Sequence, residues 1–393
     1  DYQVRYATLV ALGNETRDNP ALKQMFGLSD QIRKAVADMD KTVEQEEKNF
    51  KLISILRTIG STGLREFYPY LNEALRAEQI IVARAAVHAA GQTLDETFIP
   101  LLMPMLKAKE FEKDASEALA NYGYKVIQYL HEHIMDQPAD IDIVRAIPGV
   151  VERIGTQAGV DFLFELLDYD DIIVRSEAVR SLSAIKNQNP HLLFNKKQII
   201  RNILDEARIF QDTLTALYVQ HDRISRPVND PLDEEIIHEA RTSLIRLLEK
   251  RLDENLDRIF KFLGLKYPPE EIDIIYKGIK SPKTELRVSA IEFLDNLLEI
   301  NLKRILIPII ETSVEESLTK DKLAEMKIKV VSQRECFSML LQGRDIKVKL
   351  AVFYLLSVLK DKKYLPIVQK YVGHPNARIS SAARRASETL KNG

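Results

Sequence analysis

The chain has 393 residues, of which 45% are apolar and 29% are charged, a composition typical of folded soluble proteins. Its 14 glycines and 15 prolines are few for this length, which argues against a sandwich or barrel of short strands and favours helices. No segment approaches the roughly 20 apolar residues of a membrane span, and the one cysteine, Cys336, can form no internal disulfide. We therefore expect a soluble all-α protein in a reducing, cytoplasmic compartment, with Cys336 as a core residue.

Basic residues are concentrated in the C-terminal quarter, although the net charge is only −2. From Lys320 onward 16 Lys and Arg stand against 6 Asp and Glu, which leaves 40 against 52 in the rest of the chain. A basic end can face phosphates, an anionic membrane surface or an acidic partner, or it can consist of solvated helix faces. The residues that we select as candidate contacts to an anionic surface are Lys360, Lys362, Lys363, Arg378, Arg384 and Arg385.

Two short motifs recur along the chain. In the first, apolar residues surround a proline, at Pro69, Pro100, Pro308 and Pro366. Because proline is tolerated in the first turn of a helix, each of these segments is predicted to open one. The second motif starts with an acid or amide that is a good N-cap, followed by an aliphatic residue and often a base. Its capping residues are Asp1, Asp140, Asp171, Asp345 and Asn376.

The spacing of the second motif predicts a repeat. Its anchors Val82, Phe111, Ile143 and Val174 are separated by 29, 32 and 31 residues, and Val348 and Ile379 are again 31 apart. Such a unit holds two helices of about twelve residues and two turns, and it must stack on its neighbours to bury its apolar face. We expect hairpins at 62–91, 95–121, 124–155 and 157–185 to stack in register.

This pattern resembles the HEAT-repeat family, particularly the short subtype of bacterial proteins and phycobilisome lyases, across 62–185 and 269–390. The resemblance implies a right-handed α-α superhelix that acts as a protein–protein interaction scaffold. It also implies that the bases Arg5, Arg175, Arg287 and Lys349 bridge to the preceding acid or to a neighbouring repeat. A contact of these bases with a ligand is the alternative.

The repeat is interrupted in the middle of the chain. Loop signals at 187–190 and 225–231 flank a long helical pattern at 196–220, and a second follows at 234–262. Both exceed an ordinary repeat helix, so we predict an antiparallel pair packed into the array. The predicted division is 1–185 for N-terminal repeats, 186–268 for the long-helix insertion and 269–393 for C-terminal repeats.

The segment 249–298 resembles a block in the cytosolic HEAT regions of large bacterial membrane proteins of nucleotide-translocase-like or major-facilitator-like type. The resemblance implies that the chain is the cytosolic regulatory or docking part of such a protein, at the cytosolic face of the membrane. A first residue Asp1 in place of Met agrees with a piece of a longer protein.

Enzymatic alternatives were weighed against the scaffold. His221-Asp222, with His191 and His238, is compatible with a His-Asp metal phosphohydrolase, but the pair ends a predicted helix, where histidine complements the dipole and aspartate starts a turn. His131 and His133 are two residues apart, so they point away from each other on a helix.

The absence of tryptophan and the acidic first three quarters of the chain argue against a DNA glycosylase and against nucleic acid as a partner. A bilin-lyase activity has only the subtype resemblance in its favour. We predict a non-catalytic scaffold with a protein partner and no catalytic, metal or cofactor-binding residues.

Overall fold

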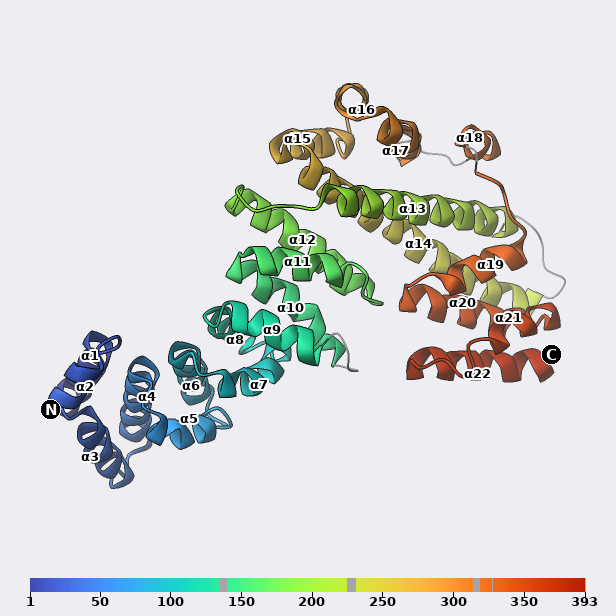
Figure 1. Cartoon of the computed structure of the whole chain (residues 1–393). Coiled ribbons are helices and arrows are strands. Elements are labelled where there is room, and N and C mark those ends of the chain that lie inside the picture. Colours follow the sequence, from blue (N-terminus) through green and yellow to red (C-terminus); the bar gives the residue numbers. More distant parts are fainter. Residues whose placement is uncertain (135–139, 225–230, 314–318, 327, 393) are drawn as a thin grey trace. The chain divides into compact units, whose positions relative to one another are not determined.

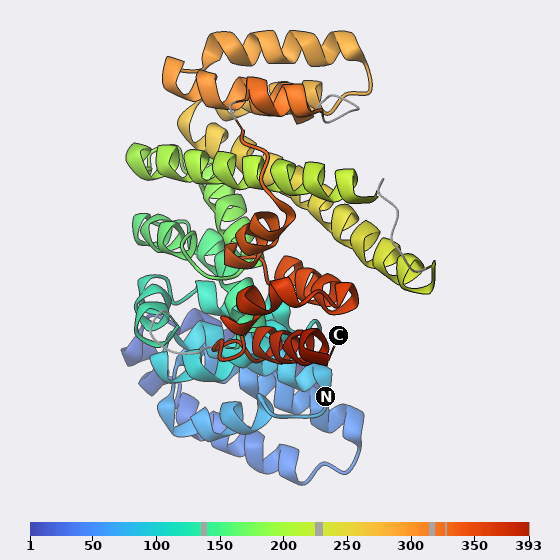
Figure 2. The ribbon, with the colours of Figure 1, turned by 90° about the vertical axis from the view of Figure 1, so that its right-hand side faces the viewer.

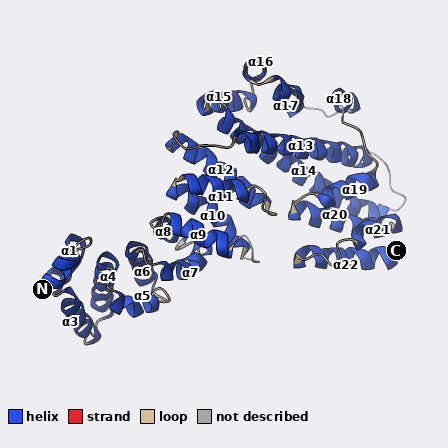
Figure 3. Ribbon diagram, in the orientation of Figure 1, coloured by secondary structure: helices blue, strands red, loops and turns tan. Residues whose placement is uncertain are grey.

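The computed structural model describes residues 1–134, 140–224, 231–313, 319–326 and 328–392, the side chains of 231–233, 320 and 322 excepted (Figure 1). Within these ranges the secondary structure consists of helices, and no strand occurs (Figure 3). The all-α prediction is therefore confirmed. None of the described helices combines the length and the apolar character that a membrane crossing requires.

The chain divides into two compact units, each with its own contacts. Unit 1 comprises Asp1–Leu167 and Gln188–Leu193, and unit 2 comprises Asp168–Asn187 and Phe194–Gly393. The three-part division of the sequence stays a prediction. The helices of unit 1 are α1 (Tyr2–Glu15), α2 (Pro20–Met25), α3 (Leu28–Asp40), α4 (Gln45–Thr62), α5 (Tyr68–Ala74), α6 (Ile80–Thr93), α7 (Ile99–Leu102), α8 (Glu112–Ala120), α9 (Tyr124–His133), α10 (Ile141–Ile154) and α11 (Gln157–Leu166), with 3-10 turns η1 (Arg65–Phe67), η2 (Glu96–Phe98) and η3 (Met103–Lys107).

Three of the predicted hairpins lie within unit 1. Their helices are α5 and α6, then α7, η3 and α8, then α9 and α10. α5 packs on α6, and α7 and η3 pack on α8, whereas α9 packs mainly on α11. We call α1, α4, α6, α8 and α10 the second helices, because α6, α8 and α10 are the second members of these pairs and α1 and α4 continue their row. They contact one another in chain order, α1 on α4, α4 on α6, α6 on α8 and α8 on α10. Small residues permit this close packing: a Cβ atom on Gly60 of α4 would lie only 2.7 Å from the Cα atom of Ala89 on α6. Stacking of all the repeats in one array stays a prediction.

Unit 2 is built around two long helices, α13 (Lys196–Ile224) and α14 (Pro231–Lys266), which pack along each other (Figure 2). The pairing of Glu206 with Arg258 and of Gln220 with Arg241 shows that they run antiparallel. The prediction of two long helices packed as a pair is thus confirmed. The remaining helices of this unit are α12 (Ile172–Gln188), α15 (Pro269–Ile279), α16 (Thr284–Leu297), α17 (Ile300–Ser313), α18 (Lys320–Glu325), α19 (Gln333–Gln342), α20 (Ile346–Leu359), α21 (Leu365–Gln369) and α22 (Ala377–Asn392), with the 3-10 turn η4 (Lys362–Tyr364).

One core of unit 2 joins the long helices to the C-terminal helices. Leu244 and Leu248 of α14 lie in it together with Phe337 of α19 and Phe353 of α20. Cys336 is fully buried in the same core, where Gln220 Nε2 donates to its sulfur at 3.6 Å. The interpretation of Cys336 as a core residue is confirmed.

The predicted helix starts are confirmed with one exception. Side chains of the five capping residues accept backbone N–H groups at the starts of α1, α10, α12, α20 and α22. Pro69, Pro100 and Pro366 lie in the first turns of α5, α7 and α21. Pro308 does not open a helix, because α17 begins at Ile300 and continues through the proline to Ser313. The prediction at Pro308 was wrong, since buried Leu302 and Leu306 extend the apolar face of the helix upstream of the proline.

Candidate functional site

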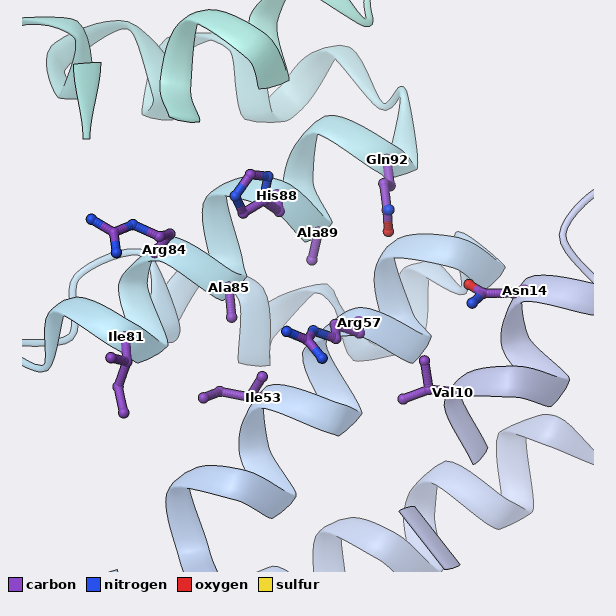
Figure 4. Close-up of a pocket in the computed structure, with 10 residues that line it drawn as sticks. All are labelled: Val10, Asn14, Ile53, Arg57, Ile81, Arg84, Ala85, His88, Ala89 and Gln92. Carbon is purple, nitrogen blue, oxygen red and sulfur yellow. The ribbon is translucent and has the colours of Figure 1, made fainter. Parts of the chain in front are cut away.

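A cavity of about 480 Å³ lies on the face of unit 1 formed by the second helices. Three elements contribute to it: α1, α4 and α6. Figure 4 shows the guanidinium of Arg57 between the α1 residues on one side and Ile81 and Arg84 on the other. The lining residues are Val10, Asn14, Ile53, Arg57, Ile81, Arg84, Ala85, His88, Ala89 and Gln92.

The helical repeat of α6 explains why its residues share this face. Ile81, Ala85, His88 and Gln92 are spaced four, three and four residues apart, so they form one stripe along the helix. The opposite side of α6 carries residues of the core, such as Ala83 and Ala90. The cavity therefore has an apolar wall of isoleucine and alanine with polar groups at intervals.

The charged residues of the cavity differ in their pairing. Arg84 Nε lies 2.8 Å from Asp114 Oδ2, and His88 Nε2 lies 3.1 Å from Asp114 Oδ1. Arg84 also donates to the carbonyl oxygen of Glu110 at 3.1 Å. Arg57 is exposed and makes no ion pair or hydrogen bond with any residue that the structure describes. Its guanidinium can therefore receive a carboxylate without breaking an existing contact.

A second cavity, of about 370 Å³, continues the first across α8 toward α10 and shares His88 and Gln92 with it. Arg153 of α10 lines it, with Nε donating to Ser116 Oγ at 3.1 Å and Nη1 lying 3.7 Å from Glu117 Oε1. We call the two cavities together the second-helix groove. Its length, apolar wall and arginine donors fit an extended or helical peptide segment.

Unit 2 has a separate cavity of about 510 Å³ between α13, α14 and the end of α17. Its wall is mixed, with the apolar Phe210, Leu214 and Leu256 and the acidic Glu249 and Asp253 among the lining residues. His221, weighed as a metal ligand and set aside in the sequence analysis, also lines it, with Nε2 4.0 Å from Glu249 Oε1.

The histidines weighed for enzymatic chemistry are dispersed. His238 is exposed on α14, and His191 belongs to unit 1. His131 contacts the ring of Phe162, whereas His133 stacks on Tyr129. In the described part of the chain, no group of three or more His, Cys, Asp or Glu side chains is placed to hold a metal ion.

The six bases selected as anionic-surface candidates are all exposed. Lys362 and Lys363 lie in η4, and Lys363 Nζ is 2.5 Å from Asp361 Oδ2. Arg384 lies on α22, with its Nε donating to the carbonyl oxygen of Val372 at 3.4 Å, on the turn before the helix. The lysines thus follow the end of α20, while the arginines are distributed along α22.

The four bases at equivalent repeat positions have different surroundings. Arg5 pairs with Asp38 of α3, which agrees with a bridge to a neighbouring helix. Arg287 donates to the carbonyl oxygen of Ser281 at 3.3 Å and to Thr284 Oγ1 at 3.1 Å. For Arg175 and Lys349 no ion pair forms with any described residue, so the expected bridge was wrong for these two. The acid before Arg175, Asp171, uses Oδ1 to accept the N–H groups of α12 instead.

Sequence patterns alone did not single out the second-helix groove. In the structure Ile80 and Ile81 are 47% and 55% exposed although they open the apolar helix α6. In the sequence they are indistinguishable from core residues, because the helical pattern there is apolar on several sides.

Comparisons with known proteins assign this chain to no family. No protein-family model matches the chain, and no curated protein matches it. Solved structures of two engineered proteins cover 100% and 82% of this chain and 96% and 95% of their own, each at 16% identity, with TM-scores of 0.28 and 0.14. Similarity at this level carries no argument about function.

Proposed function

We propose that the chain is a non-catalytic helical-repeat scaffold, a HEAT-like right-handed superhelix, that binds a protein partner in the second-helix groove. The period of 31 residues and the chain-order contacts of the second helices in unit 1 support the repeat architecture. Solenoids of this kind use the surface formed by successive equivalent helices for binding. The observation that carries the proposal is the free guanidinium of Arg57 in the groove, beside apolar residues of α1, α4 and α6.

The occupant that fits this groove is a short acidic peptide segment with one or more apolar side chains. The apolar side chain would contact Ile53, Ile81 and Ala85, and a carboxylate would pair with Arg57. Arg153 would face a second acidic residue further along the peptide, because it lines the adjoining cavity. Complementary charge of this kind raises the association rate and sets the register of the bound segment.

Fluorescence anisotropy with three labelled peptides tests this assignment. The peptides share one pattern of leucines and differ only in their intervening residues, which are Asp, Ser or Lys. We expect the Asp peptide to bind tightest, and the Arg57→Glu variant to weaken it by about tenfold because an attractive contact becomes repulsive. Lys34→Glu, an equal charge change on the exposed face of α3, is the matched control and should bind normally. Equal affinity for the three peptides, or an Arg57→Glu variant that binds as the parent does, would reject the groove.

We further propose that the scaffold is the cytosolic docking part of a larger transporter-like membrane protein and that its basic end faces an anionic leaflet. The resemblance of 249–298 to such proteins and the exposure of the six C-terminal bases support this second contact. Lys360, Lys362 and Lys363 follow one another within four residues, so several charges would meet the surface together.

A further inference from the structure

Arg175 is a buried cation whose side chain lacks a partner. It lies on α12, its exposed fraction is 7%, and its Nε has no hydrogen-bond acceptor among the described residues. Buried charged groups are ordinarily paired, because transfer of an ionised group out of water is costly unless a counter-charge compensates it. The surroundings of Arg175 therefore indicate a missing anion.

The nearest helices of unit 2 do not supply that anion. Glu206 of α13 already accepts from Arg258 Nε at 3.0 Å and from the amide of Asn255. Arg258 in turn reaches Ser176 on α12, with Nη1 at 3.4 Å from Oγ, which brings a second cation next to Arg175. The carboxylate of Glu206 is thus hydrogen-bonded to groups on α14, and it acts on Arg175 only as a nearby charge.

Two further cations approach from the start of α20. Arg344 Nη1 donates to the carbonyl oxygen of Asp168 at 3.4 Å, which holds the start of α20 beside the start of α12. Lys349, one turn into α20, has an exposed fraction of 7%, and its ammonium lies over the ring of Tyr371 at 5.7 Å from the centroid. Neither Arg344 nor Lys349 forms an ion pair within the described residues.

Most carboxylates around these cations are already engaged. Asp345 caps α20 and pairs with Arg251, and Asp168 pairs with Arg201 at 3.0 Å. Asp171 caps α12. Asp170 is exposed and is left as the carboxylate shared by Arg175 and Lys349.

The titration behaviour agrees with this geometry. Burial lowers the pKa of Arg175, the cations Arg258 and Arg344 lower it further, and Glu206 and Asp170 oppose the shift. Burial also lowers the pKa of Lys349, with Asp170 again opposing. The cations Arg175, Arg258, Arg344 and Lys349 thus outnumber the acids that act on them, Glu206 and Asp170, which leaves positive charge in excess.

We propose that Arg175, Arg344 and Lys349 form a binding site for an oxyanion of the phosphate class. A planar guanidinium and a point-like ammonium are the donors that proteins use for phosphate oxygens. Arg344 and Asp170 are exposed whereas Arg175 and Lys349 are buried, so an anion arriving from solvent would meet Arg344 first. The equivalent repeat base Arg287 differs, because it is not buried and it donates to the carbonyl oxygen of Ser281 and to Thr284 Oγ1.

Isothermal titration calorimetry and thermal unfolding with inorganic phosphate test the site, with chloride at equal ionic strength as reference. We expect phosphate to bind and to raise the unfolding temperature progressively with concentration, because it binds only the folded chain. Lys349→Met and Arg344→Gln should each lower the affinity by about tenfold, the effect of one charge-assisted hydrogen bond. Arg287→Met, the matched repeat position, should bind phosphate as the parent does.

Arg175→Met separates an anion site from a structural role of the arginine. Because an unpaired buried charge is replaced by an apolar chain, its unfolding temperature without phosphate should equal or exceed that of the parent, and the response to phosphate should vanish. O-phosphoserine is titrated in parallel. Tighter binding of O-phosphoserine than of inorganic phosphate would indicate a phosphomonoester on a partner as the ligand, and tighter binding of inorganic phosphate would indicate the free ion. No stabilisation beyond that of chloride, or parental affinity in both Lys349→Met and Arg344→Gln, would overturn the proposal.

Discussion

A Cβ atom on Gly91 would lie 2.6 Å from the Cα atom of Ala118, so α6 and α8 touch through their backbones at this point. Real Cβ atoms do not approach a backbone so closely, and backbone cannot move aside as a flexible side chain can. The same relationship links Gly60 to Ala89 one helix earlier. Glycine at these positions therefore sets the distance between consecutive second helices.

Gly91→Ala should lower the free energy of unfolding by about 1–3 kcal/mol, because the added methyl group overpacks the contact with Ala118. Urea denaturation followed by circular dichroism measures the change. Gly149→Ala is the matched control, since nothing lies within 4 Å of its Cβ position on α10. There alanine should stabilise the helix by up to about 1 kcal/mol. Equal effects of the two substitutions would contradict the close approach of α6 and α8.

Ala178→Phe should destabilise unit 2 by about 1–3 kcal/mol, because Ala178 is fully buried on α12 and a phenyl ring cannot be accommodated without strain. The measurement is the midpoint of thermal unfolding. Ala37→Phe, at an exposed position inside α3, makes the same chemical change without overpacking and should leave the midpoint nearly unchanged. If the Ala178 variant unfolded at the temperature of the parent, its placement on a packed helix face would be wrong.

Cys336 should react with a thiol reagent at pH 8 only after the chain unfolds. Burial raises the pKa of its thiol to about 11, so little thiolate is present, and the side chain is fully buried. Since the chain has one cysteine, the colour released by such a reagent reports on this residue alone. Ser381→Cys in a Cys336→Ala background places a thiol at an exposed position of α22 and should react at an ordinary rate. Rapid reaction of native Cys336 would show that the core around Gln220 is open.

The basic end should bind anionic vesicles weakly and in a salt-dependent way. Each base near an anionic leaflet contributes about 1 kcal/mol, and the attraction decays within a Debye length. Vesicle sedimentation at low and at physiological salt measures it, with neutral vesicles as reference. Changing Lys360, Lys362 and Lys363 to Glu should abolish binding at low salt. Binding that ignores both salt and charge reversal would identify the lysines as ordinary solvated side chains.

The helix starts of this chain could be predicted from the sequence because capping is local chemistry. Asp171 and Asp345 accept N–H groups two and three residues further on, so four consecutive residues contain the whole interaction. The long helices α13 and α14 were predicted for a similar reason, since the apolar patterns at 196–220 and 234–262 repeat without an intervening glycine or proline. The spacing of the repeat motif and the N-cap residues together predicted the all-α class.

Only the tertiary structure decided which of the side chains at equivalent motif positions are candidates for a functional role. Arg175 and Arg287 follow the same motif, yet Arg287 donates to Thr284 in its own first turn. Arg175 is buried near Glu206 and Arg258, and its Nε has no acceptor among the described residues. Likewise Arg57 is one exposed arginine among many until α1 and α6 pack beside it and enclose a groove. A pattern of a few residues specifies capping and periodicity, but the pairing of a charge depends on residues distant in the chain, which only the packing of helices brings within hydrogen-bonding distance.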